Sequence, residues 1–209
     1  MSLIIDFETT GLVDIAGLPY GQFPPYESIE KYKNARAVQF TMMLCNEKFE
    51  EIQLTDCIVK VDFPIPNAHF HGITDEISAK KGIPFATIAE LLSVNLKRVN
   101  HVIAHNAAFD LAILKSELYR HGFTSILEEL KKKEVLCTMK HTAPIVNIRR
   151  GRHIKDPRLG ELYRFVFNEE MKDAHNSEFD VRNLHKAIKV LYDSGRLNYA
   201  KQMVYYADA

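Results

Sequence analysis

Two acidic residues follow the first apolar run of the chain at a spacing that suits a metal ion. Asp6 and Glu8 come directly after residues 3–5 in the opening sequence MSLIIDFETTGL. Side chains alternate along a strand, so the two carboxylates would share one face, with their Cα atoms roughly 7 Å apart. Two buried carboxylates at this short distance repel each other unless a cation lies between them. The pair alone leaves two interpretations open, a metal site or acids that cap a neighbouring loop.

A third acid, Asp110, occurs in HVIAHNAAFDLAILKSEL, where a strand pattern changes to a helix pattern. At helical spacing Asp110 shares a stripe with Ala107, Leu114 and Leu118 and should face the interior. An unpaired carboxylate on a packed face costs several kcal/mol, so this acid needs a cation or a strong donor. A buried acid that is satisfied by arginine or by backbone amides is the alternative.

The segment DAHNSEFDVRNLHKAIKVL repeats the anomaly near the end of the chain. Ser177 suits a helix N-cap, and Asp180 then falls on an apolar stripe. That stripe also holds Leu184, Ala187 and Leu191. His175 lies just before the predicted helix, and from there its side chain can approach the same site as Asp180. A histidine that is neutral near pH 7 can accept a proton from an attacking water.

These acids form a set of hard oxygen ligands without cysteine, which favours magnesium or manganese over structural zinc. Two such ions about 3.5 to 4 Å apart can clamp the attacking and leaving oxygens in phosphodiester hydrolysis. The residues therefore predict metal-assisted phosphodiester chemistry.

Strand and helix patterns must bring these distant segments together. Strands are predicted over Leu3–Asp6, Ala37–Cys45, Glu50–Val61 and His101–His105. Helices are predicted over Pro84–Val99, Asn106–His121, Leu159–Glu170, Ser177–Ser194 and Arg196–Tyr206. This order predicts an α/β fold, a mixed β-sheet flanked by α-helices.

Composition excludes several classes of protein. Hydrophobic residues make up 46% and charged residues 26% of 209 residues, as in a soluble globular protein, and no run is long enough to span a membrane. The absence of a signal-like N-terminus predicts a cytoplasmic, intracellular protein. Three scattered cysteines predict buried free thiols. The chain has 27 basic residues (Lys plus Arg) and 27 acidic residues (Asp plus Glu). This balance argues against an extended duplex-binding surface, but it is compatible with a local groove that binds a short piece of nucleic acid.

Two segments have irregular patterns. Residues 13–34 are rich in aromatic residues and longer than a usual strand connection; they form either a structural flap or a loop that also touches substrate. Residues 148–158, IRRGRHIKDPR, are densely basic in a balanced chain. Such a run is either a solvated loop or one that contacts phosphates.

Three motifs resemble those of the DEDD-type, DnaQ-like 3′-to-5′ exonucleases, which have a ribonuclease-H-like fold. The motifs are DFETTGL at 6–12, HNAAFD at 105–110 and HNSEFD at 175–180. The histidine branch of that family (DEDDh) has histidine five residues before the last aspartate, and His175 is in this place. The other branch has tyrosine four residues before it, where this chain has Asn176. The resemblance implies one exonuclease domain over residues 1–209, with an insertion at about 13–34.

The resemblance also implies a role for each acid. Asp6 would bridge two Mg²⁺ ions, which Mn²⁺ could replace. Glu8 and Asp180 would complete the tighter metal site, and Asp110 would lie near the second ion. His175 would be the general base.

Substrate contacts are implied for five further residues. Thr9 and Thr10 resemble residues that hold the terminal 3′-hydroxyl, and Leu12 resembles an apolar wedge against the last bases. Asn106 and Phe109 would line the nucleotide pocket. For Leu12 and Phe109 a plain core role is the alternative.

The expected function is two-metal hydrolysis of single-stranded DNA or RNA from a free 3′ end, with release of nucleoside 5′-monophosphates. A metal-dependent endonuclease of the same fold and an inactive nucleic-acid-binding module are the alternatives. The sequence leaves open a homodimer, association with a polymerase, and the choice between DNA and RNA.

Overall fold

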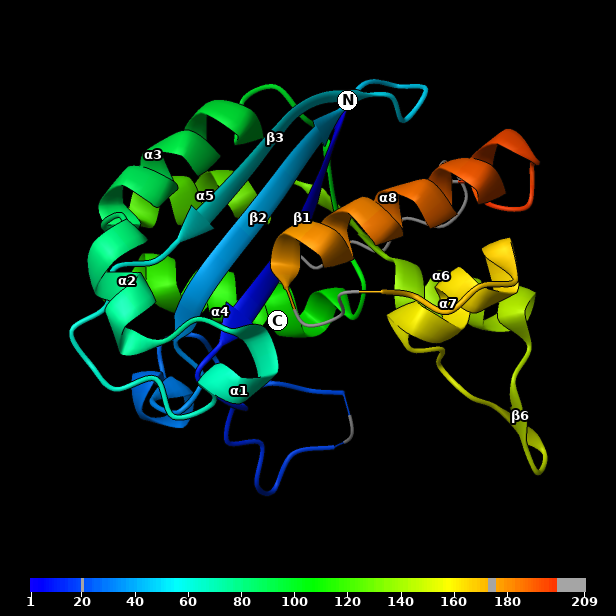
Figure 1. Cartoon of the computed structure of the whole chain (residues 1–209). Helices are drawn as coiled ribbons and strands as arrows, with labels where there is room; N and C mark the ends of the chain where they lie inside the picture. The colour runs from blue at the N-terminus through cyan, green and yellow to red at the C-terminus, as the bar shows by residue number, and fades with distance from the viewer. Residues whose placement is uncertain (20, 173–175, 199–209) are drawn as a thin grey trace.

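A five-stranded mixed sheet forms the centre of the fold in Figure 1, a computed structural model. The structure describes residues 1–19, 21–172 and 176–198. The strand order is β3-β2-β1-β4-β5; β1 pairs antiparallel with β2 and parallel with β4. The strands are β1 (Ser2–Thr9), β2 (Ala37–Cys45), β3 (Glu51–Ile58), β4 (His101–Ala104) and β5 (Glu134–Cys137). The predicted mixed sheet is confirmed.

The predicted strands all exist, and β5 was missed because its four residues, EVLC, are too short for a clear alternation. A small hairpin of β6 (Arg149–Arg150) and β7 (His153–Ile154) was also missed. Its sequence is highly charged and lacks the alternating apolar pattern that predicts a strand. All three cysteines are buried free thiols, as expected.

Four of the five predicted helices are present, and they flank the sheet. They are α3 (Phe85–Leu96), α4 (Ala107–Arg120), α7 (Leu159–Phe167) and α8 (Ser177–Asp193). The shorter elements η1 (Ile29–Tyr32), α1 (Ala68–His71), α2 (Asp75–Lys81), α5 (Thr124–Lys131) and α6 (Thr138–Val146) had no prediction. The predicted helix at 196–206 is wrong for residues 196–198, which follow the left-handed Gly195, and the rest of it lies outside the described residues. No helix within the described ranges is long and apolar enough to cross a membrane.

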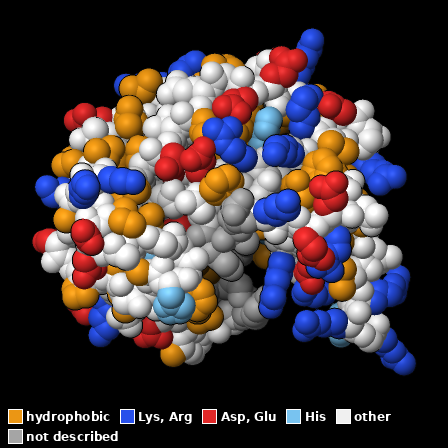
Figure 2. Space-filling view, in the orientation of Figure 1, with side chains coloured by type: hydrophobic (Ala, Val, Ile, Leu, Met, Phe, Trp, Pro, Cys, Tyr) orange, Lys and Arg blue, Asp and Glu red, His pale blue; other side chains and the backbone are white. Residues whose placement is uncertain are grey.

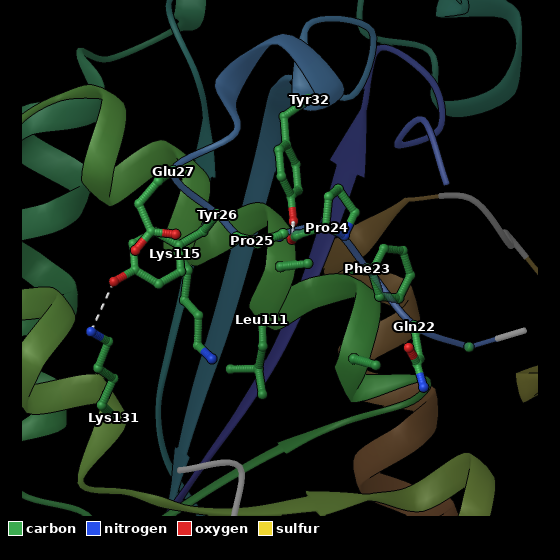
Figure 3. A pocket seen from close by; sticks show the side chains of 13 residues that line it. Gln22, Phe23, Pro24, Pro25, Tyr26, Glu27, Tyr32, Leu111, Lys115 and Lys131 are labelled. Atoms are coloured by element: carbon green, nitrogen blue, oxygen red, sulfur yellow. Dashed lines mark hydrogen bonds between the residues drawn. The ribbon is translucent and has the colours of Figure 1, made fainter. Parts of the chain in front are cut away.

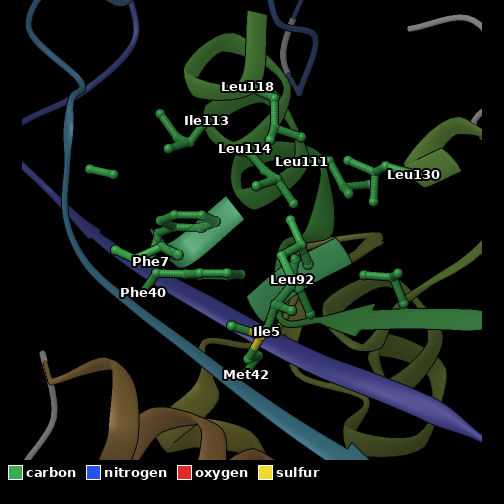
Figure 4. Packing of buried hydrophobic residues seen from close by; sticks show 14 of the residues in the cluster. Ile5, Phe7, Phe40, Met42, Leu92, Leu111, Ile113, Leu114, Leu118 and Leu130 are labelled. Atoms are coloured by element: carbon green, nitrogen blue, oxygen red, sulfur yellow. The ribbon is translucent and has the colours of Figure 1, made fainter. Parts of the chain in front are cut away.

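The sheet has a different hydrophobic cluster on each face. Leu3, Ile5 and Phe7 pack with residues of α3, α4 and α5 (Figure 4). Ile4 points the other way and packs with α8 and Leu162 of α7. Since side chains alternate along β1, Asp6 and Glu8 lie on the α8 face. Figure 1 shows α8 crossing in front of the sheet on that face.

The end of β1 is open on one side. Its pairing with β4 stops at Ile4, whereas its pairing with β2 continues to Thr9, with a register shift after Glu8. Beyond Ile4 the first turn of α4 takes the place of a neighbouring strand, because the Phe7 backbone N–H donates to Asp110 Oδ1 at 3.2 Å. This opening is where side chains from β1, α4 and α8 can meet.

Candidate active site

Asp6 and Glu8 project from the open end of β1 next to polar residues of β2. Asp6 is paired with Thr41 and Glu8 with Gln39, so all four side chains lie on one face of the sheet. Both acids are partly exposed, and a small ion can therefore reach them. The predicted placement on one face is confirmed.

Asp110 enters the site from the first turn of α4. Asn106 precedes the helix in a left-handed conformation, with φ of 71°, which turns the chain sharply from β4 into α4. Asp110 is 2% exposed, and Ala107, Leu111 and Leu114 of the same helix are also buried. The predicted inward orientation is confirmed, and the Phe7 N–H is one strong donor that keeps the acid there.

Asp180 enters from the first turn of α8. Asn176, and not Ser177, is the N-cap: its side chain accepts from the backbone N–H groups of Glu178 and Phe179. The expectation of a Ser177 cap is therefore wrong by one residue, because its hydroxyl has another partner. The apolar stripe behind Asp180 is buried as predicted.

Ser177 attaches the start of α8 to β2 through a network of buried hydrogen bonds. Its hydroxyl lies 2.6 Å from the Thr41 hydroxyl, which donates to Asp56 Oδ1 at 2.6 Å. Because the single Thr41 proton goes to Asp56, Ser177 is the donor in its bond with Thr41. The Gln39 amide donates to the same Asp56 oxygen, and its carbonyl accepts from the Ser177 N–H at 3.4 Å.

We call these four residues the β2–α8 network. In the sequence, Gln39, Thr41 and Asp56 were not singled out, and Ser177 was considered only as a helix cap. A signal was present, since Gln39 and Thr41 are polar residues two apart in an otherwise apolar strand, AVQFTMMLC. Thr41 and Ser177 are fully buried, so their hydroxyls need partners. The network fixes the helix turn that carries Asp180.

The acids converge despite their charge. One carboxylate oxygen from each of Asp6, Glu8 and Asp180 lies within 4.8 Å of the others, a grouping that could hold a metal ion. Asp110 is outside this group of three, yet its charge raises the pKa of Asp6. The structure therefore brings the four predicted acids into one region, with three of them in a tight cluster.

Burial and mutual repulsion make these acids reluctant to ionise. Burial raises the pKa of Glu8 to about 7, and the charge of Asp180 adds to this. Burial also raises the pKa of Asp110 to about 8, against the lowering effect of the Phe7 N–H. The pKa of Asp6 is well above its ordinary value, first through burial and then through its acidic neighbours. A divalent cation would reverse these shifts, so the donor set fits a hard metal ion.

The other predicted site residues have different surroundings. His175 lies outside the described residues. The Thr10 hydroxyl donates to the Asn34 carbonyl at 3.0 Å and accepts from the Arg36 N–H, while the Thr9 hydroxyl donates to the Gly11 carbonyl. These bonds shape the turn that follows β1.

Leu12 and Phe109 have opposite environments. Leu12 is 79% exposed, which excludes a core role for it. Phe109 is partly buried and packs edge-on against Phe23 of the 13–34 segment, with ring centroids 6.0 Å apart. The Asn106 side chain is partly exposed beside it.

The 13–34 segment is packed onto α4, and the two line an open pocket of about 760 Å³ (Figure 3). Tyr32 is fully buried and its hydroxyl donates to the Pro24 carbonyl. Lys131 of α5 donates to the Tyr26 hydroxyl at 2.9 Å. Figure 3 shows the Lys115 side chain of α4 directed into the pocket. The segment is therefore packed on the domain, as expected for a structural flap.

The sequence matches the family model RNase T, described as exonuclease, over residues 3–188. This chain belongs to the RNase T exonuclease family. Members of this DnaQ-like, DEDD-type family use divalent metals, and the Asp6, Glu8 and Asp180 cluster provides suitable ligands. No curated protein sequence matches this chain.

Solved structures share the fold. Exonuclease X in complex with 5′-overhanging duplex DNA has a TM-score of 0.61 at 19% identity, over 97% of both chains. Escherichia coli exonuclease I with a dA16 oligonucleotide has a TM-score of 0.65 at 16% identity, over 92% of this chain and 40% of that chain. A 3′-exonuclease that recognises the histone mRNA stem-loop has a TM-score of 0.62 at 14% identity, over 100% and 71%. At these identities the likeness shows the ribonuclease-H-like exonuclease fold.

Proposed function

We propose that this chain is a metal-dependent 3′-to-5′ exonuclease that acts on single-stranded DNA or RNA and releases nucleoside 5′-monophosphates. The observation that carries the proposal is the cluster of Asp6, Glu8 and Asp180, with Asp110 beside it. Three distant segments bring mutually repelling acids to one place, and cation binding explains this arrangement better than capping does. Family membership and the fold support the same reaction.

Two Mg²⁺ ions, or Mn²⁺ in their place, are the proposed cofactors. Asp6, Glu8 and Asp180 would hold the first ion, and Asp6 with Asp110 the second. Bound divalent ions would supply charge stabilisation to the attacking and leaving oxygens of the phosphodiester. The chain's own residues would hold four carboxylates in place at the end of β1, and a bound cation would favour their ionised form.

His175 is the proposed general base, which assigns the chain to the histidine branch. It directly precedes Asn176, the cap of α8, and lies five residues before Asp180. A neutral imidazole there would take the proton of the attacking water. A variant His175→Ala should lose roughly 10²-fold or more in kcat while it still binds Mn²⁺.

Selection of a free 3′ end would come from the turn after β1. The backbone and hydroxyl groups of Thr9 and Thr10 would contact the terminal 3′-hydroxyl. The hydroxyl, the N–H and the carbonyl of Thr10 each already have a hydrogen-bond partner, so a contact with the terminal 3′-hydroxyl would share one of these groups. The exposed Leu12 would pack against the last bases, with Asn106 and Phe109 at the nucleotide pocket. An unstacked single-stranded end enters such a pocket at lower cost than a paired end.

The test is digestion of 5′-labelled DNA and RNA oligomers with Mg²⁺, with free or blocked 3′ ends, beside covalently closed circles. We expect a ladder of shortened products from free ends only. Cleavage of circles would instead indicate an endonuclease, and binding without cleavage would indicate an inactive module. The variant Asp6→Asn should be inactive, whereas Glu90→Gln, an exposed acid on α3, should behave as the original chain.

A further inference from the structure

The β6–β7 hairpin is a basic arm that projects from the body of the protein. Figure 1 shows it extending beyond α6 and α7. The Lys155 N–H donates to the Ile148 carbonyl, which adds a third rung below the pairs Arg149–Ile154 and Arg150–His153. Gly151, with φ of 60°, gives the positive φ that a two-residue hairpin turn needs. The arm therefore reaches about 10 Å from its base.

The charges of the arm divide into a paired base and an open tip. At the base, Lys155 forms an ion pair with Glu161, and Lys140 of α6 with Asp156. At the tip Arg149, Arg150 and Arg152 are exposed. Within the described part of the chain, no ion pair joins these three guanidinium groups to an acid. The tip thus presents three guanidinium groups that are available to an external anion.

The base of the arm is fixed beside the candidate active site. His105, which directly precedes the turn into α4, has Nε2 2.9 Å from the Pro157 carbonyl and Nδ1 3.0 Å from the Thr138 hydroxyl. Burial lowers the pKa of His105 to about 4, so it joins these segments as a neutral residue. His105 therefore links the HNAAFD motif at 105–110 to the base of the arm. A nucleic-acid strand bound at Asp110 would therefore lie near the segment that carries the arm.

We propose that the β6–β7 arm binds the phosphate backbone of the nucleic-acid substrate, upstream of the nucleotides in the active site. This inference rests on the proposed function for the identity of the ligand. The net formal charge of the chain is zero, so the molecule as a whole exerts little attraction on a polyanion. Figure 2 shows Lys and Arg side chains gathered over the lobe that carries β6. Arginine suits this task because its planar fork binds phosphate oxygens in pairs.

The arm should make affinity depend on substrate length and on salt. Each phosphate neutralised on a single strand contributes about 0.7 to the slope of log affinity against log salt, so three arginines contribute about 2. A trinucleotide has only two internucleotide phosphates, and both would lie at the active site when it is bound there. The arm should therefore matter for long substrates and not for short ones.

The experiment compares the original chain with the triple variant R149A/R150A/R152A. Binding of a labelled single strand of about 20 nucleotides is measured by fluorescence anisotropy in EDTA over a salt series. Hydrolysis of that strand and hydrolysis of a trinucleotide are measured separately with Mg²⁺. A control variant, K80A/K81A/K97A, removes three exposed charges from α2 and the end of α3, which Figure 1 shows at the opposite end of the molecule from β6. A charge-preserving variant, R149K/R150K/R152K, tests rescue.

We expect the alanine variant to weaken binding and raise KM for the long strand about tenfold or more, and to lose about 2 from the salt slope. Trinucleotide hydrolysis should change less than about twofold, and the lysine variant should recover much of the binding. Unchanged long-strand binding would overturn the inference, as would an equal loss on both substrates. If the original chain cleaves nothing, the proposed function fails, while the anisotropy series still decides the role of the arm.

Discussion

The helices that carry Asp110 and Asp180 are attached to the sheet by different chemistry. Around Asp110 the first turns of α4 pack mainly through apolar side chains onto the cluster of Figure 4, and the Phe7 N–H adds one hydrogen bond to the Asp110 carboxylate. The start of α8 is instead held by hydrogen bonds among Thr41, Ser177 and Asp56. Apolar packing tolerates small shifts of a helix, whereas hydrogen bonds fix distance and direction. Of these two acids, Asp180 belongs to the three-carboxylate cluster, and the start of its helix has the larger set of hydrogen bonds to the sheet.

Removal of the Asp180 carboxylate should have the largest effect. We expect Asp180→Asn to lower kcat/KM on the order of 10³-fold, because one ligand of the three-acid cluster is lost where charge develops. The measurement is oligonucleotide hydrolysis at saturating Mg²⁺. Glu90→Gln serves as the control, and activity of Asp180→Asn near that of the control would refute a catalytic role for α8.

A polar attachment also exists on α4, about two turns after Asp110, and it should act on stability. Glu117 is 2% exposed and accepts two bonds from Arg36, at 2.6 and 3.2 Å. Glu117→Ala should lower the free energy of unfolding by about 3 kcal/mol, since it leaves a mostly buried guanidinium without its acid. Chemical denaturation measures this. The exposed pair of Lys189 and Asp193 is the control, with about 0.5 kcal/mol or less for Asp193→Ala.

The β2–α8 network should act on catalysis. We expect Thr41→Val to lower kcat about tenfold, because loss of the hydroxyl frees the first turn of α8 and leaves Ser177 without its acceptor. KM for a trinucleotide should change little, and Thr41→Ser should restore the rate. Thr142→Val removes another buried hydroxyl, which bonds the Thr138 carbonyl within α6. A loss of kcat as large in this control would show that the network has no special part.

The smallest predicted effect is a pH dependence of the metal-free protein. Glu8 and Asp110 have pKa values raised to about 7 and about 8, so the folded state holds protons that the unfolded state has already released. Stability is therefore complete below about pH 4 and falls as pH rises to about 8. We expect the melting temperature in EDTA to drop by a few degrees over this range, and less in Asp110→Asn. A rise of melting temperature in that range would contradict the assignment of these pKa values.

The sequence was informative where apolar periodicity placed an acid on a buried stripe. Asp110 and Asp180 were located this way, and the alternation of β1 placed Asp6 beside Glu8. The cap of α8 was misplaced, because Asn176 and Ser177 both suit an N-cap and the tertiary bond to Thr41 decides between them. The short strand β5 and the charged hairpin were missed because their pairing depends on partners distant in sequence or on turn geometry.

The central claim is that the converging acids exist to bind divalent cations, and a calorimetric titration with Mn²⁺ tests it most directly. At about pH 7, in two buffers of different ionisation enthalpy, we predict binding that releases protons, because the raised pKa values leave the acids partly protonated before the ion binds. The Asp6→Asn variant should lose this binding. Binding without proton release, or full binding by Asp6→Asn, would contradict the account.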